Sequence, residues 1–380
     1  MKIKQMCMLV LLWLGVIPAM QAQTFDKLWK EVEQAEKKSL PQTVIKLTGE
    51  IYQKGEMEKN SPQMLKAYMW RMKYRDMLTP DSLYTSLQEL EQWAKQADKP
   101  MDRAILHSLI AGMYADYAAN NQWQLRQRTE IAGEAPSADM REWTANMFVE
   151  KVRTNVKEAM ADSVLLLNTS SRTYIPFVEL GETSEYYHHD MYHLLASRSI
   201  EALQRIQGLD RTTPIEAYSE ETSSEKESLV KQDIERIYDQ MLTSYKAKGD
   251  KEGCLLTSLN YLNWKHGTSK SFREPFRVKK GGTYMTFDPY ETGLDALKTE
   301  YKSLDLCAEV YLAQANNAIG KEQETVALQL CDEAIRLYPG YRRINALKNL
   351  REDILAPSLN VTAAATAFPG EEIEIRASHK

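Results

Sequence analysis

The feature that most constrains this chain is an apolar periodicity of three to four residues, which runs from Phe25 to about Leu355. Apolar residues at that spacing lie along one side of an α-helix. In the segment "DKLWKEVEQAEKK", for example, Leu28, Val32 and Ala35 share one face. Strand-like alternation is nearly absent over the same range, so the chain is predicted to be mainly α.

The predicted helices come in pairs that are joined near glycine. Gly55, Gly249 and Gly320 each stand between two helical segments. Glycine accepts the left-handed conformation that ends many helices at little cost, so the first helix of each pair is predicted to end near its glycine. Two further helices are predicted to start at Pro80 and at Pro136, because proline suits the first helical turn.

The last pair matches a known repeat pattern at six positions: Tyr311, Ala315, Ala327, Cys331, Ala334 and Pro339. In a tetratricopeptide repeat, small residues let two helices approach closely and a proline ends the unit. Ala315 stands where glycine is commoner, and Cys331 stands where an aromatic residue is usual. We therefore predict a degenerate tetratricopeptide-like array of helical hairpins. An irregular helical bundle is the alternative.

Two stretches interrupt the helical pattern. The segment "SFREPFRVKKGGTYMTFDPYETG" places a Lys-Lys-Gly-Gly turn between apolar residues, which predicts a β-hairpin inserted between helices. Its basic residues could bind an anion, although charges beside a turn are more often simply solvated. They are Arg273, Arg277, Lys279 and Lys280. After Pro357, a second alternating stretch predicts two strands about Pro369 and Gly370. The chain is expected to end just inside a β-rich domain, because a lone hairpin is marginal in water.

The first 22 residues have the order of a secretory signal peptide. Lys2 and Lys4 precede an apolar run from Met8 to Ile17, and small and polar residues then lead to a predicted cleavage point after Ala22. The run is too short for a stable membrane anchor. The mature protein is predicted to be exported and soluble, in the periplasm or outside the cell. The chain's net charge of −5, without a basic stripe, argues against a nucleic-acid partner.

Three cysteines remain after the leader: Cys254, Cys307 and Cys331. An odd and sparse set does not suit a disulfide scaffold. Each lies in a helical pattern among apolar residues, where a buried cysteine behaves as a small hydrophobic side chain. Buried free thiols are therefore predicted, and a Cys307–Cys331 bridge across a helix pair is the alternative.

The segment "EYYHHDMYH" gathers three of the chain's six histidines, His188, His189 and His193, behind Glu185. A helix is predicted over about 185–207, which would place His189 and His193 together on its polar face, with Glu185 one turn earlier. That spacing can bring two imidazoles to one metal ion. However, zinc hydrolases of this type have Glu after the first His, whereas Asp190 stands here, and no third ligand follows. An ordinary surface pair is favoured.

No signature of catalysis stands out elsewhere. The sequence contains no Gly-x-Ser-x-Gly elbow, no phosphate-binding glycine loop and no dinucleotide fingerprint. The chain is therefore not predicted to be an enzyme, and no catalytic, cofactor-binding or metal-binding residue is assigned. Tyr186, Tyr187 and Tyr192 are candidates for surface contact, although tyrosine is equally common in helical packing.

Four long stretches resemble one family. They are "FDKLWKEVEQAEKKSLPQTVIKLTGEIYQK", "NQWQLRQRTEIAGEAPSADMREWT", "YIPFVELGETSEYYHHDMYHLLASRSIEAL" and "LNVTAAATAFPGEEIEIRAS". They look like the amino-terminal region of very large exported alpha-2-macroglobulin-family proteins of Gram-negative anaerobic bacteria. The resemblance implies a helical region over 23–356, followed from 357–380 by the incomplete start of a macroglobulin-like β-sandwich. Phe368-Pro369-Gly370-Glu371 resembles the turn of its opening hairpin.

Proteins of that family act as protease traps, in which cleavage of a bait segment makes the molecule close on the protease. Some members carry a thioester in a Cys-x-Glu-Gln sequence, which is absent here. The resemblance thus implies a non-catalytic scaffold with protein partners, among them proteases engaged by downstream domains. A stand-alone periplasmic tetratricopeptide-like module that binds a protein or peptide is the alternative. A metal-dependent enzyme built on Glu185, His189 and His193 is the third hypothesis.

Overall fold

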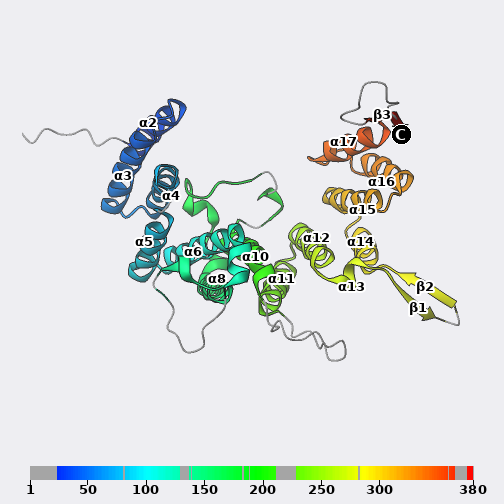
Figure 1. The fold of residues 1–380 in the computed structure, drawn as a ribbon, viewed down its shortest axis with the longest axis horizontal. Helices are drawn as coiled ribbons and strands as arrows, with labels where there is room; N and C mark the ends of the chain where they lie inside the picture. The colour runs from blue at the N-terminus through cyan, green and yellow to red at the C-terminus, as the bar shows by residue number, and fades with distance from the viewer. Residues whose placement is uncertain are drawn as a thin grey trace, which may run out of the picture. The chain divides into compact units, whose positions relative to one another are not determined.

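The computed structural model describes residues 24–79, 82–128, 137, 139–181, 184–187, 189–210, 228–280, 283–357, 359–363 and 375–379. The chain is mainly helical and carries two small antiparallel β-hairpins (Figure 1). It forms two compact units. Unit 1 comprises Met1–Ser184 and His189–Asp233, and unit 2 comprises Glu185–His188 and Ile234–Lys380. The predicted mainly-α class is therefore confirmed.

Unit 1 is built from nine described α-helices and the first turn of another, α11 (Leu229–Lys248). The nine are α2 (Phe25–Lys37), α3 (Pro41–Met57), α4 (Ser61–Leu78), α5 (Ser82–Gln96), α6 (Pro100–Asn120), α7 (Gln122–Gln127), α8 (Ala145–Ala159), α9 (Ser163–Asn168) and α10 (Met191–Ile206). The 3-10 turns η1 (Met140–Glu142), η2 (Ser171–Tyr174) and η4 (Gln207–Leu209) join some of them. Proline opens α3, α4 and α6, where its missing N–H costs nothing.

Consecutive helices of unit 1 pack side by side. α3 packs against α2 and α4, and α5 packs against α6 (Figure 1). The long helix α6 also packs against α8 and α10, so it is buried on several sides, with Leu106, Ile110 and Ala115 almost fully buried. These burials explain why α6 shows apolar residues all round, as expected for a central helix.

α3 ends near Gly55, as the sequence had predicted, but Gly55 is not the residue that follows the helix end. α3 continues to Met57, and the left-handed residue of the turn is Lys59, with φ of 53°. Gly55 instead lies where α3 meets α4, because a Cβ there would stand 2.8 Å from Cγ of Met64. Its lack of a side chain allows the close approach. Gly249, by contrast, follows α11 with φ of 67° and ends it as predicted.

The helix predicted to start at Pro136 starts later. Pro136 lies outside the described residues, η1 comes first, and α8 begins only at Ala145. Trp143 interrupts the helix because its backbone is extended and its side chain is buried. The indole Nε1 donates a hydrogen bond to the carbonyl of Ser137, and the ring stacks on Tyr114.

Unit 2 contains the rest of α11 and six further described α-helices. These are α12 (Lys251–Thr268), α13 (Lys270–Arg273), α14 (Pro289–Glu300), α15 (Ala308–Gly320), α16 (Glu324–Leu337) and α17 (Ile344–Leu355). The 3-10 turn η3 (Ser184–Tyr186) is shared with unit 1 at its first residue, and η5 (Asp305–Cys307) precedes α15. α12 packs on α14, and α15 packs on α16, which packs on α17.

The small residues of the predicted repeat are all in the core between α15 and α16. Ala315, Ala327, Cys331 and Ala334 have no exposed surface. Tyr311 is also buried, and its ring meets that of Tyr338 edge to face. Gly320 is the last residue of α15, while the left-handed residue of the turn is Glu322, with φ of 59°.

Both predicted β-hairpins are present. β1 (Phe276–Lys280) pairs with β2 (Thr283–Phe287), and β3 (Leu359–Ala363) pairs with β4 (Ile375–His379). The register places Phe276 opposite Phe287 and Lys279 opposite Tyr284. Pro369 and Gly370, predicted to form the second turn, lie outside the described residues.

The predicted signal peptide, residues 1–22, also lies outside the described residues. Among those that are described, no helix combines the length and the apolar character needed to cross a bilayer. Cys254, Cys307 and Cys331 are buried free thiols, as predicted, so Cys307 and Cys331 are not bridged.

Candidate functional site

A cleft of about 710 Å³ lies in unit 1, between the helical hairpins α3–α4 and α5–α6. Its walls come from the carboxyl-terminal halves of α3 and α5, and its floor comes from the starts of α4 and α6. The lining side chains are Tyr52, Glu56, Lys59, Ser61, Met64, Gln88, Glu89, Gln92, Trp93, Gln96, Ala97, Asp98, Lys99 and Asp102. A cleft of this size matches those that hold small ligands or short peptide segments.

The aromatic wall of the cleft is formed by Tyr52 of α3 and Trp93 of α5. Trp93 meets the rings of Tyr52 and Tyr68 edge to face, with centroids 5.6 Å and 5.7 Å away. The guanidinium of Arg71 lies 5.4 Å from the centroid of each tyrosine, a cation–π arrangement. Burial raises the pKa of Tyr52, and the charge of Glu56 raises it further, so its hydroxyl stays neutral.

The floor is a chain of hydrogen bonds centred on Asp102, which is 8% exposed. The hydroxyls of Ser61 and Tyr174 donate to its two carboxylate oxygens, at 2.5 Å and 2.6 Å. Lys99 Nζ donates to Ser61 Oγ at 2.9 Å and to the carbonyl of Lys59 at 3.1 Å. The floor therefore ties α4, α6 and η2 together.

A Ser–Lys–Asp set invites a comparison with nucleophilic catalysis, but the geometry is that of a structural link. A serine nucleophile needs a neighbouring base that takes its proton. Here Ser61 is buried, it already donates to Asp102, and Lys99 is placed as a donor to it. Asp102 also accepts from Tyr174, which satisfies its second oxygen.

A row of amides also lines the cleft along α5. Gln88, Gln92 and Gln96 follow one another at four-residue spacing along α5 and are exposed. None of the three side chains bonds to another described residue, and the same is true of Glu56 and Asp98. Sequence reasoning missed this row, although its spacing of four was visible and would have placed the three amides on one helical face.

The predicted helix that carries the histidine cluster is wrong at its start. α10 begins at Met191, because Asp190 caps it by accepting a hydrogen bond from the backbone N–H of His193 at 2.9 Å. His189 therefore precedes the helix, so His189 and His193 do not share one of its faces. Glu185 belongs to unit 2, where Arg342 pairs with it at 3.1 Å. His188 lies outside the described residues.

Within the described ranges, no three His, Cys, Asp or Glu side chains are grouped so that they could hold a metal ion. The candidate tyrosines take part in packing. Tyr186 lies 6.3 Å from Tyr341, and Tyr187 lies 6.3 Å from Tyr245, as measured between ring centroids. Tyr192 is 5% exposed.

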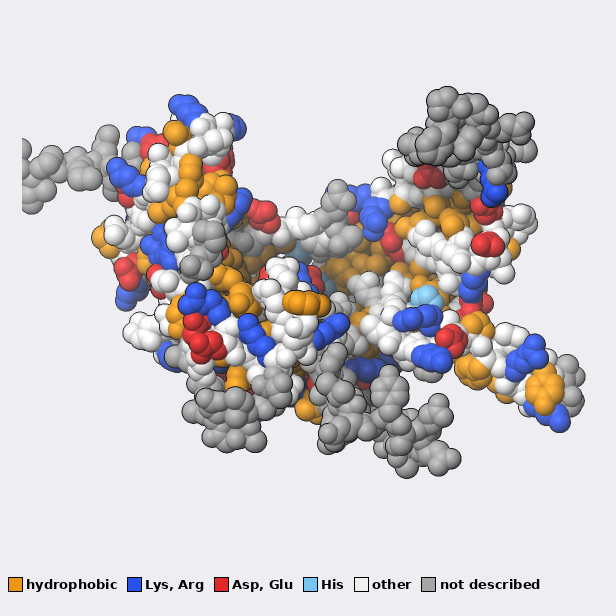
Figure 2. Space-filling model, viewed as in Figure 1, with side chains coloured by type: hydrophobic (Ala, Val, Ile, Leu, Met, Phe, Trp, Pro, Cys, Tyr) orange, Lys and Arg blue, Asp and Glu red, His pale blue; other side chains and the backbone are white. Residues whose placement is uncertain are grey.

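Two of the basic residues in and beside the β1–β2 hairpin have partners of their own. Arg273 donates to the carbonyl of Gly267, and Lys279 lies over the ring of Tyr284. Figure 2 shows basic and hydrophobic side chains next to one another on this hairpin. The side chain of Lys280 lies outside the described part of the chain.

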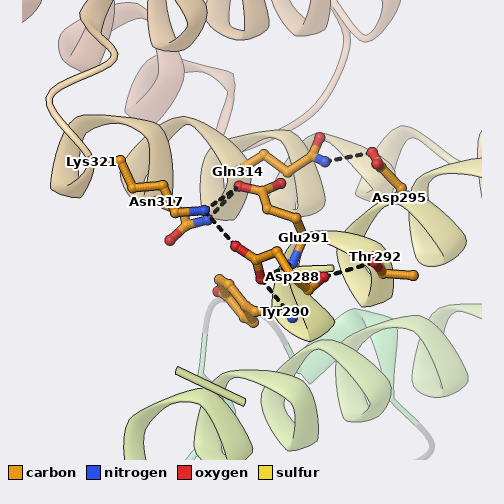
Figure 3. A network of polar contacts seen from close by, with 8 residues as sticks. All are labelled: Asp288, Tyr290, Glu291, Thr292, Asp295, Gln314, Asn317 and Lys321. Atoms are coloured by element: carbon orange, nitrogen blue, oxygen red, sulfur yellow. Dashed lines mark hydrogen bonds and ion pairs between the residues drawn. The ribbon is translucent and has the colours of Figure 1, made fainter. Parts of the chain in front are cut away.

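A second polar network lies between α14 and α15 in unit 2 (Figure 3). Asp288 caps α14 by accepting from the N–H groups of Tyr290 and Glu291, and Lys321 Nζ donates to it at 2.8 Å. Burial alone would raise the pKa of Asp288, but these hydrogen bonds outweigh it and lower the pKa. Asn317 donates to Glu291. The members satisfy one another, so this network joins helices rather than forming an open site.

The cleft of unit 1 is thus the best candidate for a binding site, since it combines space with unengaged polar groups. No family model, curated protein or solved structure matches this chain.

Proposed function

We propose that this chain is a non-catalytic helical scaffold, the amino-terminal docking region of an exported alpha-2-macroglobulin-like protease inhibitor. The observation that carries the proposal is the cleft between α3–α4 and α5–α6, whose glutamine row makes no bond to another described residue. Polar groups left unengaged on a rigid wall are what a partner needs to be recognised.

Three further observations support the macroglobulin-like context. The leader has the order of a signal peptide, which fits an exported protein. Several long stretches resemble the amino-terminal region of that family. The antiparallel pair β3–β4 fits the opening hairpin of a macroglobulin-type β-sandwich, although its turn lies outside the described residues.

Paired helices with small residues between them support a tetratricopeptide-like array. Such arrays serve as binding surfaces, so a stand-alone periplasmic module that binds a peptide or protein is the second candidate. Both candidates use the same cleft. They differ in whether the cleft belongs to a large protease inhibitor or to a small binding protein.

A protease-protection assay separates the two candidates. The full gene product that contains this chain would be mixed with trypsin, and cleavage of a large protein substrate would be compared with cleavage of a small chromogenic peptide. A trap encloses the protease, so we expect cleavage of the large substrate to fall while the small one is still cut.

The isolated chain is the control, and we expect it to leave both cleavage rates unchanged. Equal effects of the full product on both substrates would overturn the inhibitor proposal and favour the stand-alone module. Hydrolysis of either substrate by the isolated chain without trypsin would overturn the non-catalytic assignment.

A further inference from the structure

We propose that the cleft of unit 1 binds an extended peptide segment that carries a basic side chain. This inference rests on the proposed docking function and gives the chemistry of the partner at that site. It follows from the glutamine row, the aromatic wall and the balance of charges in the cleft.

The glutamine row matches the repeat of an extended backbone. Side chains four residues apart on a helix are separated by about 6 Å along its axis. An extended chain repeats every two residues, over about 6.8 Å. Successive glutamines of the row, Gln88, Gln92 and Gln96, can therefore face alternate residues of a peptide that lies along α5. The long glutamine side chains absorb the small difference in pitch.

Glutamine is also the right chemical partner for a peptide backbone. Its amide has a carbonyl acceptor and an NH₂ donor, the same pair of groups that each backbone unit presents. Three such amides along one face, exposed and unengaged, would bond the N–H and C=O groups of alternate residues in a peptide about five residues long. The row bonds to the peptide backbone, so it recognises the extended conformation of a peptide rather than its sequence.

The charges in the cleft select the side chain. Four carboxylates line it, namely those of Glu56, Glu89, Asp98 and Asp102, against two ammonium groups, those of Lys59 and Lys99. Glu89 is paired with Arg75 at 3.1 Å, and Asp102 is held by two hydroxyls. Glu56, Asp98 and the ammonium group of Lys59 make no bond to another described residue. Two available carboxylates thus stand against one available cation, so Glu56 and Asp98 are the groups that meet a Lys or Arg of the peptide.

The aromatic wall supplies the apolar contact for the same side chain. Tyr52 and Glu56 lie one turn apart on α3, and both line the cleft opposite α5. The methylene stem of a Lys or Arg can lie against Tyr52 and Trp93 while its charged end reaches Glu56. The floor is already locked by hydrogen bonds, so little order has to be gained on binding.

Calorimetric titration of this chain with capped pentapeptides tests the proposal. The probe is acetyl-Thr-Lys-Thr-Lys-Thr-amide, and its match is the same peptide with Glu in place of Lys. We expect saturable binding of the lysine peptide and binding of the glutamate peptide that is weaker by about tenfold or more. Equal affinity for the two peptides, or no binding of the lysine peptide, would overturn the proposal.

Backbone methylation tests the two-residue repeat. Two further lysine peptides carry N-methyl groups on their odd or on their even backbone nitrogens. We expect one pattern to weaken binding by about tenfold and the other by much less, because only alternate residues face the row. Equal losses for both patterns would contradict the ladder arrangement.

Gln92→Ala provides the matching change in the protein. We expect it to lower the affinity for the lysine peptide by about fivefold, because the central amide of the row is lost. Gln34→Ala is the control, since Gln34 is an exposed glutamine of α2 outside the cleft. Unchanged affinity in Gln92→Ala would overturn the assignment. If the peptide fails to bind while the full gene product still protects the large substrate, this inference falls and the proposed function stands.

Discussion

At the scale of single residues, the glutamines of the cleft can act together because they lie on the same face of α5. The spacing of Gln88, Gln92 and Gln96 fixes a common helical face, and that could be predicted. What faces the row could not be predicted, because Tyr52 and Lys99 belong to other helices and a single sequence does not say which helices lie side by side. The cleft therefore emerges only from the packing of two hairpins.

The role of Gly55 also depends on a neighbouring helix that the sequence does not identify, and a substitution can test it. We expect Gly55→Val to lower the free energy of unfolding by about 1–3 kcal/mol, because the added side chain meets Met64 at the contact between α3 and α4. Chemical unfolding followed by circular dichroism measures the change.

Gly49→Val is the matched control, since Gly49 lies on the same helix with nothing within 4 Å of its position for a Cβ. It is expected to change the free energy by no more than about 0.5 kcal/mol. Equal effects of the two substitutions would show that helix propensity, rather than close approach, governs Gly55.

At the scale of elements, helices and hairpins could largely be predicted, and their ends could not. The Lys-Lys-Gly-Gly turn and the flanking apolar residues gave the β1–β2 hairpin. The start of α10 was misplaced because the residues before Asp190 fit a helical apolar pattern, whereas the cap decides where a helix begins. Periodicity describes the interior of a helix and says little about its ends.

Asp190 should therefore be tested as a cap. We expect Asp190→Ala to destabilise unit 1 by about 1–2 kcal/mol, because the first turn of α10 loses the acceptor for the His193 N–H. Asp190→Asn should retain most of the stability, since asparagine caps helices about as well. Thermal unfolding of both variants measures the difference, and an equal loss in both would show that the negative charge, rather than the cap, matters.

At the scale of the whole molecule, the chain combines a predicted export signal with three buried thiols. Burial raises the pKa of Cys254 and of Cys307, and it raises that of Cys331 to about 11. The thiolate is the reactive form of cysteine, so each is protected both by its surroundings and by its protonation. Burial thus shields the three thiols without a cross-link between them.

Alkylation followed by mass spectrometry tests this protection. We expect the folded mature chain to take up iodoacetamide slowly at pH 8, and the urea-unfolded chain to take up three adducts without prior reduction. Dithiothreitol should leave the melting temperature unchanged. A mature chain that accepts only one adduct until it is reduced would instead indicate a disulfide.

The β1–β2 hairpin has a consequence for how copies of this protein meet. It is a two-stranded sheet, so the outer edge of each strand presents backbone groups that the described chain leaves unpaired. Its apolar side chains Phe276 and Val278 remain about half exposed beside them. A strand from another molecule can pair with such an edge. The cations Arg277 and Lys279, which project from the same strand, make two copies repel, and dissolved salt weakens that repulsion beyond about 8 Å. Added salt should therefore favour strand pairing between copies at this edge.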